Sequence, residues 1–492
     1  MTYVSSVFSL LSESTMRTPT RLLLLGAALA SAPLAAQETT VASATTGTKD
    51  TTTTTTADSA KAKTPEKKEA TGISVVPTIE IQHIRANDQR GINVFEAPKN
   101  DKVEYAGFKL SFGAAFTQQF QGLGHENTAA PKMVAGATAG APQTNANQLI
   151  QIGHGFNNAV ANLYVNAQLA KGIRVSMTSY LSARHHNETW VKDGYLQIDD
   201  SPLDVAPLVT LMQYTTVKAG HFEINYGDGH FRRTDNGNSM YNPLVGNYIL
   251  DAFTTQVGGE VYLRGRGLLD GAFVMGGMTN GEVRGTILNP TKRSPAYLTK
   301  VGIDRQLSKD LRVRLTGSSF AQARSANQTL YSGDRAGSRY YDVLENTTST
   351  ETANHTSGAL NPGMNELHAL AVNPFVKFRG LELFGQLERA RGKAVTETAR
   401  RDLTQTVVEG TYRLFHDRLY ASARYNGVSG RLAGMANDVS VDRTQFGGGW
   451  FINPLIVLKA EWVNQQYDDF PPTDIRNGGK FRGFVVEGGV AF

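Results

Sequence analysis

The segment that most restricts the possible fold is 108–120, in which apolar and polar side chains alternate. The apolar side chains share one parity: Phe108, Leu110, Phe112, Ala114, Phe116 and Phe120. The polar side chains share the other: Lys109, Ser111, Thr117 and Gln119. Successive side chains of a β-strand point to opposite faces, so this segment would have one apolar and one polar face. A strand of this length is unusual in a soluble sandwich and typical of a strand that crosses a membrane, with its apolar face toward lipid.

The same alternation recurs along the chain and predicts about sixteen strands. The candidate strands are 108–120, 160–169, 173–182, 191–199, 216–224, 256–264, 269–278, 298–307, 311–320, 368–378, 381–391, 404–414, 418–427, 443–452, 455–466 and 482–492. An even number of strands places both ends of the barrel on the same side of the membrane, in the periplasm.

The connections between these strands alternate between short and long. Short turns lie at 170–172, 265–268, 308–310, 379–380, 415–417 and 453–454. Long loops cover 121–159, 225–255, 279–297, 321–367 and 467–481. Short periplasmic turns and long external loops are typical of transmembrane barrels. We therefore predict an all-β fold, a transmembrane antiparallel β-barrel over residues 108–492, with one longer structured turn at 200–215 on the periplasmic side.

The residues before the barrel predict an exported protein. Arg17 and Arg21 precede a short apolar run and small residues that end at Ala36, so residues 1–36 resemble a signal peptide, and Met16 is a candidate start. Residues 37–71 are rich in Thr, Ala and Lys and cannot bury enough apolar surface to fold, which predicts a disordered periplasmic segment. A tethering role is the alternative for this segment. Residues 72–107 would form a periplasmic lead-in to the barrel.

Composition excludes several classes of protein. The chain has no cysteine, which excludes a disulfide scaffold, thiolate zinc sites and thiol catalysis. The formal net charge of +5 is small for 492 residues, so a nucleic-acid partner is not expected. Beyond the signal, no stretch approaches the roughly eighteen apolar residues of a transmembrane helix.

The loop 225–255 concentrates charged and aromatic residues between glycines. It contains Asp228, His230, Arg232, Arg233 and Asp235, followed by Tyr241 and Tyr248. Through Val217–Gly227 and Phe231–Asn236, the chain resembles the porin-like families of Gram-negative outer membranes, most nearly the phosphate-selective porin O and P group. The resemblance covers the barrel from about residue 103 to residue 492. The Lys-rich loops expected of a phosphate-selective member are not evident in this sequence.

This resemblance implies roles for the loop and for the last strand. In such porins the third external loop folds into the lumen and sets the constriction, so the candidates for selectivity are His230, Arg232, Arg233 and Asp235. A solvated external loop is the alternative interpretation. The resemblance also implies that barrel-assembly machinery recognises the terminal strand, whose lipid-facing residues would be Phe484, Val486, Val490 and Phe492.

Strand parity predicts which charged side chains point into the lumen. The basic candidates are Arg174, Arg264, Lys300, Arg312, Arg314, Lys377, Arg413, Arg418, Arg424 and Lys459. The acidic candidates are Glu260, Asp304, Glu382, Glu388, Glu409, Glu461 and Glu487. Charges that face lipid at the membrane midplane cost up to about 4 kcal/mol, so inward placement is favoured. The excess of basic side chains predicts a water-filled lumen with a mild preference for anions.

Enzymatic motifs are weak in this sequence. His185, His186 and Glu188 resemble metal ligands, but adjacent histidines on a strand face opposite sides, and the group falls in a predicted loop. No Gly-x-Ser-x-Gly elbow is present. We therefore expect no enzymatic activity, no metal and no cofactor.

These features predict a porin of a Gram-negative-type outer membrane, through which small anionic or neutral hydrophilic solutes diffuse passively. Two alternatives stay open: a non-conducting barrel whose loops serve surface binding or adhesion, and a substrate-specific channel for phosphate or saccharides. The contact residues of a saccharide channel would be Tyr241, Tyr248, Tyr340 and Tyr341. The expected partners are outer-membrane lipid, the assembly machinery and the solutes, and both a monomer and a homotrimer fit the sequence.

Overall fold

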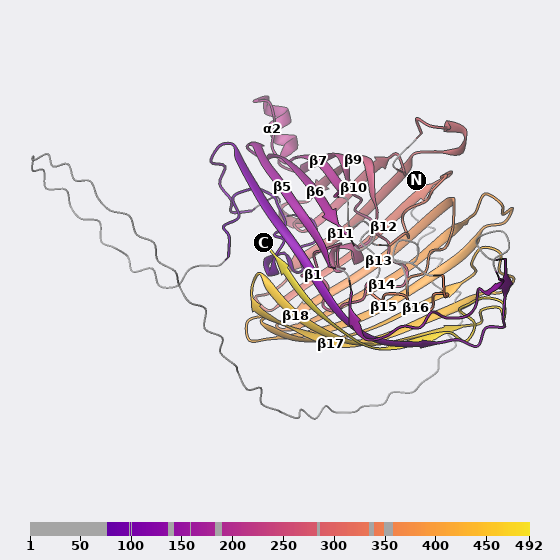
Figure 1. Ribbon diagram of the computed structural model, residues 1–492. Helices are drawn as coiled ribbons and strands as arrows, with labels where there is room; N and C mark the ends of the chain where they lie inside the picture. Colours follow the sequence, from indigo (N-terminus) through magenta and orange to yellow (C-terminus); the bar gives the residue numbers. More distant parts are fainter. Residues whose placement is uncertain are drawn as a thin grey trace, which may run out of the picture. The chain divides into compact units, whose positions relative to one another are not determined.

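The computed structural model describes residues 76–97, 99, 101–135, 142–157, 159–182, 189–282, 286–333, 339–348 and 358–492. The predicted signal peptide, the Thr-rich segment and the group from His185 to Glu188 lie outside these residues. Within the described part, sixteen long antiparallel strands and the two-residue strand β4 form one sheet (Figure 1). The prediction of an all-β barrel of about sixteen strands is confirmed.

The strands of the first half are β1 (Lys109–Glu126), β4 (Gly155–Phe156), β5 (Val160–Ala170), β6 (Ile173–Leu181), β7 (Trp190–Ile198), β8 (Thr215–Glu223), β9 (Thr255–Arg264), β10 (Ala272–Thr279) and β11 (Ala296–Gln306). Those of the second half are β12 (Leu311–Gln322), β13 (Glu366–Phe378), β14 (Leu381–Lys393), β15 (Arg401–Leu414), β16 (Leu419–Gly430), β17 (Val439–Asn453), β18 (Ile456–Asp468) and β19 (Lys480–Ala491). A separate ribbon joins β2 (Met133–Val134) to β3 (Thr144–Asn145).

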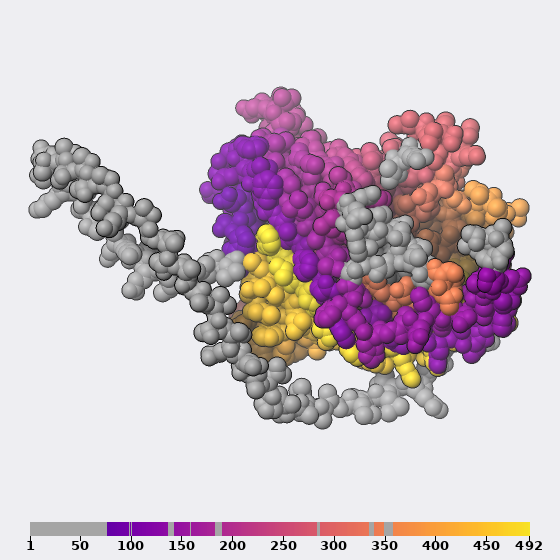
Figure 2. Space-filling model, viewed as in Figure 1, coloured from indigo at the N-terminus to yellow at the C-terminus, as the bar shows by residue number. Residues whose placement is uncertain are grey.

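The first strand closes the sheet into a barrel. The first half of β1 pairs with β5, and its second half pairs with β19, from Ala115 opposite Ala491 to Glu126 opposite Lys480. The indigo N-terminal strand and the yellow C-terminal strand accordingly lie side by side in Figures 1 and 2. Because every long strand has two neighbours, no open edge is left to expose unpaired backbone groups to lipid.

The barrel has an apolar exterior and a charged interior, which inverts the pattern of a soluble protein. Large apolar side chains on the outer face are about half exposed, among them Leu163, Val261, Leu315, Leu387, Val408 and Trp462. The polar side chains, which alternate with the apolar ones on the same strands, are buried. The fully buried side chains include Arg424, Arg443, Lys300 and Lys459. An apolar belt around a closed antiparallel barrel is the surface of a protein that spans a bilayer.

Short elements shape the ends of the barrel. The helix α2 (Ala206–Met212) lies in the connection from β7 to β8, where the sequence predicts a structured turn, and Pro207 stands in its first turn. The 3₁₀-helix η3 (Gly267–Leu269) occupies the predicted start of β10, so that strand begins three residues later than predicted. None of the helices in the described part is long and apolar enough to cross a membrane.

Candidate functional site in the lumen of the barrel

Loop 224–254, which joins β8 to β9, lies inside the barrel, and none of its residues is exposed. Side chains of the wall bind its backbone. Glu461 on β18 accepts hydrogen bonds from the amides of Val245 and Gly246, at 2.7 and 3.1 Å. Asn426 on β16 accepts one from the amide of Ile249 at 2.7 Å. Inward polar residues of the strands therefore replace the water that would otherwise solvate this backbone.

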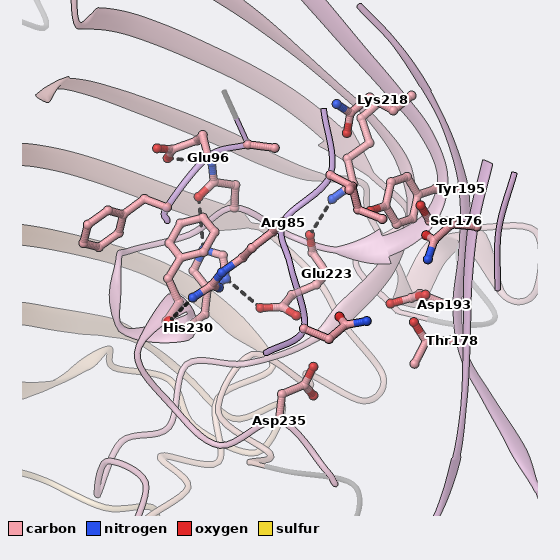
Figure 3. A pocket seen from close by; sticks show the side chains of 18 of the residues that line it. Arg85, Glu96, Ser176, Thr178, Asp193, Tyr195, Lys218, Glu223, His230 and Asp235 are labelled. Carbon is pink, nitrogen blue, oxygen red and sulfur yellow. Dashed lines mark hydrogen bonds and ion pairs between the residues drawn. The ribbon is translucent and has the colours of Figure 1, made fainter. Parts of the chain in front are cut away.

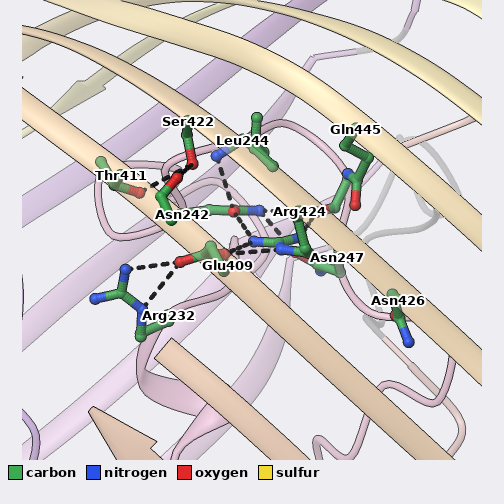
Figure 4. A network of polar contacts seen from close by, with 12 residues as sticks. Arg232, Asn242, Leu244, Asn247, Glu409, Thr411, Ser422, Arg424, Asn426 and Gln445 are labelled. Atoms are coloured by element: carbon green, nitrogen blue, oxygen red, sulfur yellow. Dashed lines mark hydrogen bonds and ion pairs between the residues drawn. The ribbon is translucent and has the colours of Figure 1, made fainter. Parts of the chain in front are cut away.

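The four residues predicted for the constriction are all in this loop, and each faces a charged partner. Arg232 pairs with Glu409 at 2.7 Å and with Glu382 at 3.6 Å. The other three pairs are Arg233 with Asp251 at 2.6 Å, His230 with Glu223 at 2.6 Å, and Asp235 with Lys192. Figure 4 shows Arg232 and Arg424 on either side of Glu409. A constriction role for the four residues stays a prediction.

The side chains predicted to line the lumen are mostly turned inward and paired. The main pairs are Lys300 with Asp228 at 2.7 Å, Arg312 with Asp304 at 2.7 Å, Arg413 with Glu382 at 2.9 Å, Arg424 with Glu409 at 2.6 Å and Lys459 with Glu487 at 2.6 Å. Arg418 differs, because it lies in the turn before β16 and is exposed. The lumen is thus not the open, water-filled space that strand parity predicts, since loops occupy much of it.

A second loop, 323–365 between β12 and β13, also contributes buried residues in its described parts. The hydroxyl of Tyr340 donates to Glu461 at 2.5 Å, and that of Tyr331 donates to Glu388 at 2.6 Å. Arg443 on β17 donates to the carbonyl oxygen of Gly358 at 2.5 Å. Tyr340 is only 2% exposed, so this one of the four tyrosines predicted to contact a saccharide is packed against the wall.

The third lumenal element is the N-terminal lumen segment, residues 76–97. Asn93 donates to Glu382 of β14 at 2.6 Å, and the carboxylate of Glu96 pairs with Arg314 and Lys300 at 2.8 and 3.1 Å. The ring of Phe95 is 3% exposed. The sequence predicts a lead-in for this region and gives no sign that it enters the lumen, because its mixed composition has no clear periodicity.

Charge compensation within these contacts sets the ionisation of the buried groups. Burial alone would raise the pKa of Glu96, but Arg314 and Lys300 outweigh it and hold that pKa well below its ordinary value. The same two cations lower the pKa of Asp228 against the effect of burial. Burial lowers the pKa of His230, against the hydrogen bond with Glu223 that would raise it. Glu96 and Asp228 are therefore anions inside the barrel.

A polar cavity of about 230 Å³ remains between these segments and the wall of β5–β9 (Figure 3). Four basic side chains line it without an ion pair to any carboxylate in the described part of the chain. Each donates to a neutral oxygen instead: Arg85 to Phe231 O at 2.9 Å, Arg174 to Gln197 Oε1 at 2.7 Å, Lys218 to Glu223 O at 3.2 Å and Arg264 to Ala97 O at 3.2 Å.

The same cavity has an acidic side. Lys192 faces Glu223 at 3.4 Å, Asp193 at 4.0 Å and Asp235. Three carboxylates of the cavity thus gather around one lysine, whereas the four other cations have no ion pair with a carboxylate in the described part of the chain. Arg174 and Arg264 were predicted to point inward. Lys218 was missed, although its alternation with Val217 on a predicted strand was the signal that could have found it.

A second cavity, of about 360 Å³, lies beside the ends of β9–β12 that carry the short turns. Phe95, Glu96 and Arg264 line both cavities, so the end of the N-terminal lumen segment stands between them. Among the described residues, no group of three or more His, Cys, Asp or Glu side chains is placed to hold a metal ion.

The closed sheet, the outward apolar belt and the charged interior define a transmembrane β-barrel of the outer membrane.

No family model matches the sequence, and no curated protein matches it. Solved structures with a similar fold include an anion-selective porin from Comamonas acidovorans, at 10% identity and a TM-score of 0.46, over 78% of this chain and 100% of that chain. The channel DcaP of Acinetobacter baumannii is 9% identical, with a TM-score of 0.45, over 79% of this chain and 99% of that chain. OprB of Pseudomonas putida is 9% identical, with a TM-score of 0.44, over 78% of this chain and 94% of that chain.

Proposed function

We propose that this protein is a non-enzymatic outer-membrane channel through which small hydrophilic solutes diffuse, with a mild preference for anions. The observation that carries the proposal is the cavity beside β5–β9, where Arg85, Arg174, Lys218 and Arg264 have no carboxylate partner in the described part of the chain. Solutes would pass through this narrow space rather than along the axis of the barrel.

The anion preference follows from which cations are compensated. Arg232 and Arg424 share the carboxylate of Glu409, so each of these guanidinium groups has an acidic partner within the protein. Arg174 and Lys218 have no carboxylate partner in the described part of the chain and donate to neutral oxygens. In a narrow lumen with little water to screen it, an uncompensated cation attracts anions and repels cations.

Reversal potentials in planar bilayers test this proposal. The double variant Arg174→Gln/Lys218→Gln should shift the reversal potential in a salt gradient toward cation preference. A matched control, Lys171→Gln/Arg431→Gln, removes the same formal charge from exposed side chains outside the cavity and should leave the potential unchanged. An equal potential for both double variants would contradict the anion preference.

The filled lumen favours one other function, that of a barrel which does not conduct and whose external loops bind a surface partner. No residue of loop 224–254 is exposed, and many of the described residues of loop 323–365 are buried, which leaves only limited space for a solute. Repeated silence in bilayers, from protein whose heat-modifiable mobility shows that it is folded, would support this second function. Discrete conductance steps would support the channel.

A further inference from the structure

One contact inside the barrel has the chemistry of a ligand in its site. The carboxylate of Glu96 receives two contacts from the guanidinium of Arg314, at 2.8 Å from Nη1 and 3.1 Å from Nη2. The ammonium of Lys300 lies 3.1 Å from the same carboxylate. A guanidinium fork with a nearby ammonium is the arrangement by which proteins bind a carboxylate. Here the carboxylate belongs to the chain's own N-terminal lumen segment.

The wall and the loop carry an excess of positive charge at this place when Glu96 is left out. Three cations of β11 and β12 are involved, Lys300, Arg312 and Arg314. They face two other carboxylates, Asp228 and Asp304, in contacts of 2.7 to 3.2 Å. Glu96 therefore supplies the third negative charge, and without it the site would keep a net charge of about +1 in a space with little water.

Other contacts of residues 93–97 with the wall are polar, so water and ions can compete with them. Arg312 donates to the carbonyl oxygen of Asn93 at 2.9 Å, and Arg264 donates to that of Ala97 at 3.2 Å. The main apolar contact is Phe95, whose ring centroid lies 5.4 Å from that of Phe375. Movement of residues 93–97 away from the wall would break these polar contacts and would expose the ring of Phe95, which is buried among Phe375, Phe384 and Val407.

The position of Glu96 links this contact to passage through the barrel. Glu96 and Phe95 separate the cavity beside β5–β9 from the cavity beside the turn ends of β9–β12. Movement of residues 93–97 away from the wall would join the two cavities.

We propose that Lys300 and Arg314 form a binding site for small organic carboxylates, and that Glu96 occupies this site until such a solute displaces it. The solute class follows from the occupant, because the site already holds a carboxylate. This inference rests on the proposed channel function. Displacement would release residues 93–97 and widen the passage for the solute that caused it.

Trypsin cleavage of the folded full-length protein tests the displacement directly. Cleavage after Arg85 requires the N-terminal lumen segment to leave loop 224–254 and the wall, because the Arg85 guanidinium donates to the carbonyl oxygens of Gly91 and Phe231. Mass spectrometry detects this cleavage as the fragment that begins at Ala86. Succinate should accelerate this cleavage several-fold compared with chloride at the same ionic strength. Glu96→Gln should be cleaved roughly tenfold faster without succinate, since a charge-assisted contact is lost, and should no longer respond to succinate.

A matched control is Glu487→Gln, which removes another buried carboxylate of the lumen, one that pairs with Lys459 at 2.6 Å. This variant should keep the slow cleavage and the response to succinate. Equal cleavage of the unmodified protein in succinate and in chloride would overturn the inference, and this arm needs no variant to fold. Conductance in bilayers is read separately. Succinate-dependent cleavage without conductance would contradict only the channel function, and conductance with succinate-insensitive cleavage would contradict only the displacement.

Discussion

Arg232 of loop 224–254 lies 2.7 Å from Glu409 of β15, and both side chains are almost fully buried. The same carboxylate pairs with Arg424 of β16 at 2.6 Å. One acidic side chain thus joins the lumenal loop to two strands of the wall. A buried charge network of this kind is stable only when each charge keeps its partners, so the loop and the wall depend on each other.

Replacing Arg232 with Met should lower the free energy of unfolding by about 2 kcal/mol, because hydrogen bonds to a charged group are lost while Glu409 keeps Arg424. Urea unfolding of the protein in lipid vesicles measures this change. Arg431→Met is the control, since its pair with Asp438 is half exposed and should contribute less than about 1 kcal/mol. Equal losses in the two variants would show that the buried network does not hold the loop.

Replacing both Arg232 and Arg233 with Ala should also change the permeation of ions. Glu409 would lose one partner, and Asp251 would lose the guanidinium that lies 2.6 Å from it. The freed negative charge should shift the reversal potential toward cation preference, and the loosened loop should raise the conductance. If neither quantity changes in a bilayer, selectivity belongs to wall residues such as Arg174 and Lys218.

The alternation of side chains was enough to predict the wall of the barrel. Lipid accepts apolar side chains and rejects charged ones, so every strand must show the two-residue period, and the predicted strand 381–391 corresponds to β14 (Leu381–Lys393). The long strand β1 was predicted to end at residue 120. It continues to Glu126, because residues beyond the alternating segment still pair with β19, as Glu126 does with Lys480.

The contents of the lumen could not be predicted in the same way. Inward parity shows that a side chain avoids lipid, but it does not show whether its partner is water or another part of the chain. Loop 224–254 is rich in Asn, Gly and charged residues, as a solvated loop would be, yet Asn242 and Asp228 are fully buried. Some of their partners come from strands more than eighty residues away along the chain, such as Arg314 for Asp228 and Arg424 for Asn242. Only the path of the loop brings them together.

Deleting Phe492 should lower the heat-modifiable, folded fraction of the protein in outer membranes. Its amide donates to the carbonyl oxygen of Ala114 at 2.9 Å, and its carbonyl oxygen accepts from the amide of Ala114 at 3.0 Å, so the residue takes part in closing the barrel. The side chain is 49% exposed on the outer face. Phe492→Trp keeps both the backbone and an aromatic side chain and should fold normally. Undiminished folding of the deletion variant would remove the predicted role of this residue in assembly.

Stability should fall as the pH drops below about 6.5, the ordinary pKa of histidine, because of His230. Burial lowers the pKa of His230 in the folded barrel, so below pH 6.5 the unfolded chain binds the proton more readily than the folded one. The contribution of neutral His230 to the free energy of unfolding is therefore present above pH 6.5, and it is lost as the pH falls toward the lowered pKa. Asp228, Glu223 and Lys300 are the charged groups around the ring. His230→Gln should flatten the dependence of the urea midpoint between pH 8 and pH 5. The exposed His416→Gln should keep it, and equal slopes for both variants would contradict this origin.

Replacing Gly246 with Ala should separate the two lumenal loops. A Cβ at this position would overlap the hydroxyl of Tyr340, which donates to Glu461 at 2.5 Å, while the amide of Gly246 donates to the same carboxylate at 3.1 Å. Because Tyr340 cannot move without losing its buried acceptor, the substitution should cost about 1–3 kcal/mol in the free energy of unfolding. Gly276→Ala on β10 is the matched control, since no other atom lies within 4 Å of the added carbon. Urea unfolding of both variants in lipid vesicles measures the two free energies of unfolding. If Gly246→Ala is as stable as Gly276→Ala, then loops 224–254 and 323–365 are not packed against each other through Tyr340 in the membrane.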